Sequence, residues 1–306
     1  LVAGNGTGLA RDADTCFNIM LGCNAGACLN AGDYNIFLGK DAGRCVTTAE
    51  FTIALGLGAL SEQTVTGSYN MAFGPLAGKN VTSGCQNIIM GHQAGCEIST
   101  GCCNIALGKN AGGGNSTGGT TGNWNISLGA CAGNYLDSGY KNVFLGCYAG
   151  RCTTSGYDNV YIGSCAGRGD GSSFTGYENV FIGKWTGRDI CTGYKNVFIG
   201  GCAGKQIETG YLNVAIGDGA GKSLENSIGN VFVGACAGCD QGHQDNFNTF
   251  LGYKSGSLQV GGCGSIVIGA CIDKLPFACD SGGSANEGCQ LVIGYKDNIW
   301  ISGDKH

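Results

Sequence analysis

Apolar residues recur along the chain in a short phrase with a fixed outline: Asn, three mostly apolar residues, and a closing Gly. The clearest copies are residues 142–146, 159–163, 179–183, 196–200 and 213–217. The phrase usually recurs every 17 residues, and two variable residues and Ala-Gly most often follow it. A fixed short period indicates one small structural unit that is stacked on itself.

The positions of the closing glycines show how many copies of the phrase the chain contains and where the spacing between copies is irregular. They mark 16 copies, at Gly22, Gly39, Gly56, Gly74, Gly91, Gly108, Gly129, Gly146, Gly163, Gly183, Gly200, Gly217, Gly234, Gly252, Gly269 and Gly294, with a degenerate copy at Gly4. Three longer steps predict loop insertions near residues 113–122, 168–174 and 273–288 that leave the flanking phrases intact. We therefore expect residues 1–306 to form a single continuous repeat array, and we expect that array to be a piece of a longer fibre.

The content of the repeat predicts an all-β fold. Seventeen residues are too few for a helical hairpin, and the repeat shows no 3.6-residue periodicity. β-Branched and aromatic residues bounded by glycines are typical of a short strand. One strand per repeat, with turns between, predicts a parallel β-solenoid or β-roll of about 16–17 coils, with equivalent strands about 4.8 Å apart.

Alternation along each strand assigns its residues to two faces. The residues one and three after the Asn are almost always aliphatic, and we expect them to fill the interior of the coil. The residue between them then points outward, although it too is apolar in nearly every copy. An outward apolar file needs a partner, and another copy of the chain is the economical one. We therefore predict a homo-oligomer with this seam: Phe144, Tyr161, Phe181, Phe198, Phe232 and Phe250.

The Asn that opens the phrase is a structural position. Stacked at one level per coil, its side chains are placed to bond to one another as an amide ladder. The members in the clearest copies are Asn142, Asn159, Asn179, Asn196 and Asn213. The closing Gly and the Gly four residues later suit turn conformations with positive φ.

The chain has 20 cysteines, and two pairs of them occupy equal positions in adjacent coils. Cys28 and Cys45 both lie six residues after a closing Gly, and Cys85 and Cys102 both lie six residues before one. A spacing of about 4.8 Å between coils is within the Cα separation that a disulfide accepts. Both pairs are candidate disulfides in an oxidising compartment. A zinc site is not expected, because the single CxxC has no matching second pair.

Composition and charge narrow the function classes. Gly makes up 60 of 306 residues without a collagen period, and the net charge of −5 argues against nucleic-acid binding. No apolar run reaches the length of a membrane span, so membrane insertion is not expected. No catalytic motif stands out, so we expect no enzyme activity, no catalytic residues and no cofactor.

A file of tyrosines lies two residues before the Asn in five consecutive repeats. Its members are Tyr140, Tyr157, Tyr177, Tyr194 and Tyr211. Together with Trp124 and Trp185 they are candidate stacking platforms for glycans. The alternative, which we favour, is that these aromatic rings stack on one another and stabilise neighbouring coils.

The repeat also resembles two families. Residues 213–217 are similar to the head repeats of trimeric autotransporter adhesins, in which three left-handed β-rolls pack around an axis. The fuller repeat over residues 192–204 more closely resembles bacteriophage tail fibres that end in an auto-cleaving intramolecular chaperone domain. Residues 290–304 resemble the segment that commonly precedes that chaperone. The likeness to adhesins departs in period and does not extend to a coiled-coil stalk or a membrane anchor. The likeness to tail fibres does not extend to the chaperone domain itself, so we claim no self-cleavage.

The resemblance to tail fibres implies the structural shaft of an extracellular trimeric fibre that supports host attachment. Its partners would be copies of itself, with a host receptor or glycan bound through another part of the fibre, and its location the virion tail. Two alternatives stay open: an adhesin head on a bacterial cell surface, and a self-assembling extracellular filament subunit.

Overall fold

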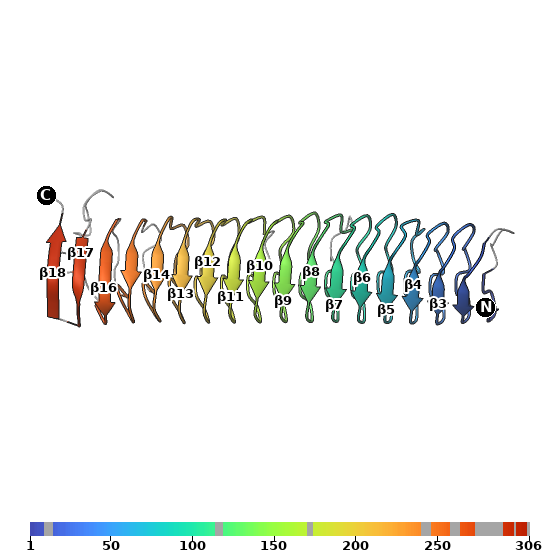
Figure 1. Cartoon of the computed structure of the whole chain (residues 1–306), viewed down its shortest axis with the longest axis horizontal. Coiled ribbons are helices and arrows are strands. Elements are labelled where there is room, and N and C mark those ends of the chain that lie inside the picture. The colour runs from blue at the N-terminus through green and yellow to red at the C-terminus, as the bar shows by residue number, and fades with distance from the viewer. Residues whose placement is uncertain are drawn as a thin grey trace. The chain divides into compact units, whose positions relative to one another are not determined.

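The computed structural model describes residues 1–8, 15–113, 119–169, 174–239, 246–257, 264–272, 290–296 and 298–304. Throughout these residues the regular elements are strands joined by turns (Figure 1). The chain divides into two compact units, Leu1–Tyr157 and Asp158–His306. Each unit is a parallel β-solenoid with a repeat of about 17 residues, as the sequence predicts. The continuity of one array across the boundary stays a prediction.

The first unit contains nine short strands, which pair in parallel and in chain order. They are β1 (Val2–Ala3), β2 (Ile19–Leu21), β3 (Ile36–Leu38), β4 (Ile53–Leu55), β5 (Met71–Phe73), β6 (Ile88–Met90), β7 (Ile105–Leu107), β8 (Ile126–Leu128) and β9 (Val143–Leu145). Each strand is one copy of the apolar phrase, and equivalent residues pair with each other.

The second unit continues the pattern and ends differently. Its strands are β10 (Val160–Ile162), β11 (Val180–Ile182), β12 (Val197–Ile199), β13 (Val214–Ile216), β14 (Val231–Val233), β15 (Thr249–Leu251), β16 (Ile266–Ala270), β17 (Gln290–Tyr295) and β18 (Asn298–Asp304). Strands β10 to β17 pair in parallel, whereas β18 turns back and pairs antiparallel with β17.

The interior of each coil corrects the expected orientation of the strands. The middle residue of the strand is inside, and the first and third residues face outward. The proposed seam residues are all completely buried in the coil's own core: Phe144, Tyr161, Phe181, Phe198, Phe232 and Phe250. They cannot form a surface between chains. The expectation was wrong because both faces of the strand are apolar, so alternation alone does not say which face is inside.

Two glycines in each coil are required by its close packing. Gly200, which closes a phrase, has φ of +132°, and a Cβ there would collide with the backbone of Gly217 in the next coil. Gly204, four residues on, has φ of +54°, and a Cβ there would collide with the ring of Phe198. The positive φ predicted for these two positions is confirmed.

The longer repeats leave the strand register unchanged. Ile105 of β7 pairs with Ile126 of β8, and Val160 of β10 pairs with Val180 of β11. The extra residues therefore enter between strands, as predicted. Parts of all three predicted insertions, residues 114–118, 170–173 and 273–288, lie outside the described residues.

Candidate functional surface

The most extensive repeated surface is an aliphatic stripe on the outer face of the strands. In the first unit it consists of the first and third residues of β2 to β9: Ile19, Leu21, Ile36, Leu38, Ile53, Leu55, Met71, Phe73, Ile88, Met90, Ile105, Leu107, Ile126, Leu128, Val143 and Leu145. None of these side chains is buried; Ile88 is 39% exposed and Met90 48%. The stripe carries no charge. The second unit has a corresponding stripe, formed by the first and third residues of β10 to β16, with the polar Thr249 in β15, and by Leu291 and Ile293 of β17; Ile266 is 42% exposed and Leu291 40%.

The amide ladder is present behind the strands, inside the coil. The backbone N–H and the side-chain amide of Asn196 both donate to Oδ1 of Asn179, each at 3.0 Å. The same amide donates to the carbonyl of Gly210 at 2.9 Å, and Oδ1 of Asn196 accepts the N–H of Asn213 at 3.0 Å. Each Asn thus satisfies a turn carbonyl and a backbone N–H that would otherwise be buried without partners.

The other predicted ladder members make corresponding bonds. The amides of Asn142 and Asn159 donate to glycine carbonyls at 2.8 and 2.9 Å, and Asn179 donates to Asn159. All of these Asn side chains are fully buried. Asn and the middle strand residue are two apart and share a face, so the ladder itself indicates which strand residue is inside.

The core aromatics stack along the axis of the second unit. The ring centroids of Tyr161 and Phe181 are 4.8 Å apart, and those of Phe181 and Phe198 are 5.1 Å apart, with nearly parallel planes. Burial raises the pKa of the Tyr161 hydroxyl well above its usual range, while a hydrogen bond with Asn179 acts in the opposite direction. The aromatic rings thus join consecutive coils within the solenoid.

The file of candidate glycan platforms is stacked upon itself. Tyr177 and Tyr194 are 4.8 Å apart, Tyr194 and Tyr211 4.7 Å, and Tyr140 and Tyr157 5.0 Å, all with ring planes within 10° of parallel. The facing surfaces of these rings cover each other and are closed to a sugar. The arrangement favours the structural interpretation of this file over the glycan-binding one.

A second aromatic file has no counterpart in the sequence-based predictions. Phe17, Tyr34, Phe51 and Tyr69 each precede the opening position of a phrase, and their stacked rings are 4.8–5.1 Å apart. All four are exposed and have positive φ, between 51° and 62°. The 17-residue period was sufficient to place these four residues at equal positions of their coils, but nothing in the residue types signals a left-handed backbone. Trp124, one of the proposed platform residues, occupies the same position of its coil and is 57% exposed.

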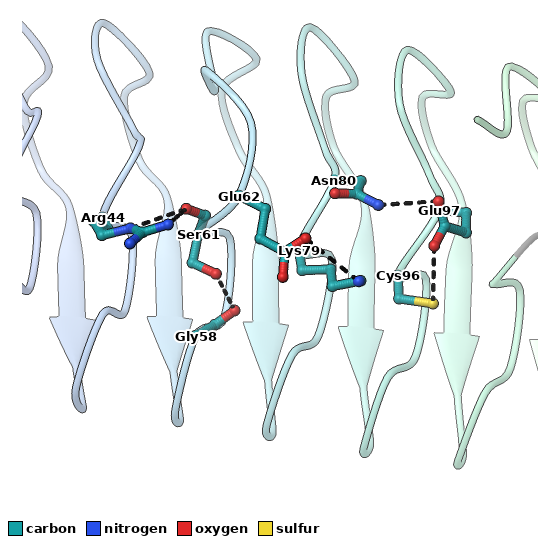
Figure 2. A network of polar contacts seen from close by, with 8 residues as sticks. All are labelled: Arg44, Gly58, Ser61, Glu62, Lys79, Asn80, Cys96 and Glu97. Carbon is teal, nitrogen blue, oxygen red and sulfur yellow. Dashed lines mark hydrogen bonds and ion pairs between the residues drawn. The ribbon is translucent and has the colours of Figure 1, made fainter. Parts of the chain in front are cut away.

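Polar side chains on the turns of the first unit link neighbouring coils (Figure 2). Arg44 donates to the carbonyl of Ser61, Lys79 pairs with Glu62 at 3.4 Å, and Asn80 donates to Glu97 at 2.9 Å. Each of these contacts spans 17 residues, which is one coil. The polar groups therefore contact adjacent repeats and do not converge on a common point as in a catalytic centre.

The predicted cysteine pairs are brought together in different degrees. The Sγ atoms of Cys85 and Cys102 are 2.6 Å apart. Burial raises the pKa of Cys45, and the neighbouring Cys28 thiol adds to the effect while Arg44 opposes it. All four residues are free thiols in this structure, so their oxidation stays a prediction.

The described residues contain no group of His, Cys, Asp and Glu suited to a metal ion. The described part also has no helix that could cross a membrane. Comparison with protein-family models, curated proteins and solved structures gives no match.

Proposed function

We propose that the chain is the structural shaft of an extracellular fibre made of three copies, most like a phage tail fibre that supports host attachment. The observation that carries the proposal is the uncharged aliphatic stripe. It faces outward on every strand from β2 to β9 and again on β10 to β17, where Thr249 of β15 is a polar exception. Isolated exposed aliphatic side chains need no explanation, but a contiguous apolar file marks an interaction surface.

The area of the stripe suits an interface between copies. Full burial of a Leu or Ile side chain contributes about 1.5–3 kcal/mol, which corresponds to roughly 60–120 Å². With about a third of each side chain exposed, the stripe of one unit amounts to roughly 300–650 Å², and those of both units to roughly 600–1,300 Å². A stable interface needs about 800 Å² per partner.

The spacing of the stripe favours another copy as the partner. Its side chains repeat at the separation of parallel strands, about 4.8 Å. A second solenoid of the same sequence presents the same spacing and the same uncharged surface. The number three comes from the resemblance to tail fibres and adhesin heads, in which three chains pack around an axis.

The mechanical role follows from how the coils are joined. Backbone ladders connect each coil to the next, and the Asn ladder and stacked core aromatics reinforce many of these connections. We assign the chain no catalytic activity, because the polar contacts described above link adjacent coils and do not converge on one point. A host receptor or glycan would then be bound by another part of the fibre, and the assembly would lie outside the cell in the virion tail.

The seam is tested by a pair of charges within it. The double variant Ile88→Asp/Met90→Asp places two carboxylates in the stripe, where association would bury them unpaired. We expect native mass spectrometry to show trimers of the unmodified chain and monomers of this variant, with the same far-UV circular dichroism. The matched control is Gln63→Asp/Thr64→Asp, which adds the same charge at exposed turn positions and should remain trimeric.

Two results would overturn the proposal. A monomer of the unmodified chain would remove the seam, and hydrolysis of glycans by the purified protein would remove the non-catalytic assignment. Electron microscopy separates the remaining alternatives: discrete rods agree with a fibre shaft or an adhesin head, and a helical lattice indicates a filament. Neighbouring genes for baseplate proteins would favour the shaft, and an encoded stalk and anchor would favour the adhesin.

A further inference from the structure

The core of the first unit contains a small cavity beside β7 and β8. The buried middle residue is Ala106 in β7 and Ser127 in β8, whereas the other coils of this unit have Met, Phe, Ile or likewise Ala. A cavity of about 10 Å³ lies there, lined in part by Ala106, Thr120 and Ser127. The Ser127 hydroxyl is buried and has no hydrogen-bond partner among the described residues. Apolar packing therefore joins the β7 and β8 coils less closely than Phe or Met at these two positions would.

Two thiols meet across the coils that enter this region. Cys85 and Cys102 lie two residues before Asn87 and Asn104, so they are at the same level of consecutive coils. Their Sγ atoms are 2.6 Å apart, and the N–H of Cys85 points to Sγ of Cys102 at 3.0 Å. Both residues are partly accessible. In the second unit this position holds the stacked tyrosines, which also couple one coil to the next.

The neighbouring cysteines are directed elsewhere. Sγ of Cys103 donates to Oε1 of Gln86 at 3.2 Å, although Cys103 is adjacent to Cys102 in sequence. Sγ of Cys96 faces Glu97 at 3.9 Å on the turn shown in Figure 2. The geometry therefore selects one pair from four nearby thiols.

We propose that Cys85 and Cys102 form a redox-controlled disulfide that clamps the β6 and β7 coils together, β7 being one of the two strands that line the small cavity. The oxidant is a low-molecular-weight disulfide such as oxidised glutathione. One thiolate attacks it, forms a mixed disulfide and releases one thiol; the second protein thiolate then displaces the other thiol. Two protein thiols and one small disulfide become one protein disulfide and two small thiols.

The electrostatics of the pair affect how fast this disulfide can form. The hydrogen bond to Cys102 is the main cause that raises the pKa of Cys85 to about 11, with burial and the neighbouring thiols adding to it. Exchange needs a thiolate, so oxidation should be slow at neutral pH and faster in alkali. The clamp is independent of the number of chains in the fibre.

The bond is tested by peptide mapping of the full chain. The reduced protein is incubated with oxidised glutathione, free thiols are alkylated, and the digest is analysed by mass spectrometry. We expect a cross-linked peptide pair containing Cys85 and Cys102, absent after Cys85→Ser and retained after the matched control Cys96→Ser. Full alkylation of both cysteines in the oxidised protein would overturn the proposal, as would Cys102 joined mainly to another partner.

The clamping role needs a separate readout. In a Cys28→Ser background, which removes the other candidate pair, reduction should lower the melting temperature of the first unit. A loop of 17 residues predicts a shift of about 6–12 °C. The double variant Cys85→Ser/Cys102→Ser should melt at the reduced value under both conditions. A cross-linked protein that melts with its reduced form would show a bond that does not clamp.

Discussion

Replacement of Phe198 by Ala is the sharpest test of which strand residues are inside the coil. Phe198 is the middle residue of β12, is completely buried and stacks on Phe181 at 5.1 Å. Its neighbour in the next coil is Ala215, which has no bulk with which to fill the space. The site therefore collapses poorly when the ring is removed.

The expected loss in the free energy of unfolding is large for a single substitution. Phe→Ala in a core destabilises by about 3–5 kcal/mol, and the poor collapse next to Ala215 places Phe198→Ala in the upper part of that range. For a unit of about 150 residues each kcal/mol lowers the melting temperature by about 2–4 °C. We expect a loss of roughly 8–20 °C, measured by circular dichroism during heating.

The adjacent residue supplies the control. Ile199 belongs to the stripe and is 36% exposed, so Ile199→Ala should cost about 1 kcal/mol within one chain. Its effect should appear instead as weaker association in native mass spectrometry. The reverse result, in which Phe198→Ala melts normally but dissociates and Ile199→Ala unfolds, would refute the orientation described above.

Further substitutions test the other contacts. Asn196→Ala should destabilise by more than about 3 kcal/mol in urea denaturation, because several buried partners each lose a bond worth about 1–3 kcal/mol. Ser127→Ala should be neutral or slightly stabilising, since its hydroxyl has no partner in the described structure; a loss above about 1.5 kcal/mol would contradict this. Gly204→Ala should lower the melting temperature, since φ there is +54° and Cβ would meet a core ring. The raised pKa of Cys85 stabilises the reduced fold below pH 9, and this contribution should disappear as the pH rises towards about 11; Cys85→Ser should abolish that loss.

Much of the fold could be predicted from the repeat, because backbone pairing enforces it. A phrase that returns every 17 residues places each Asn above the last, and the ladder follows from the two-way bonding of an amide. The orientation of the strand could not be obtained from hydrophobicity, since Val197, Phe198 and Ile199 are all apolar. It depends on whether Asn196 lies inside the coil. The hydrogen bonds of Asn196 show that it does, whereas a polar residue would by its type be expected at the surface.

The surface was less predictable than the fold. Equal positions in adjacent coils located the Cys85 and Cys102 contact, because coil stacking converts a sequence offset into a distance. The exposed file of Phe17, Tyr34, Phe51 and Tyr69 was missed, since the residue before the opening position has positive φ in many coils whatever its type, and residue type therefore gives no signal. The repeat period identifies which residues are neighbours in adjacent coils, but it does not say which of them are exposed to solvent.

The unchanged register across the long repeats has a consequence for how such a protein changes over generations. Ile105 still meets Ile126 although their separation is 21 residues, because the additional residues leave the strand and its Asn in place. A coil can thus gain new surface without any adjustment of the coils above or below it. Changes in the surface turns therefore need not disturb the strands on which folding depends. A lineage in a changing environment can alter one turn at a time.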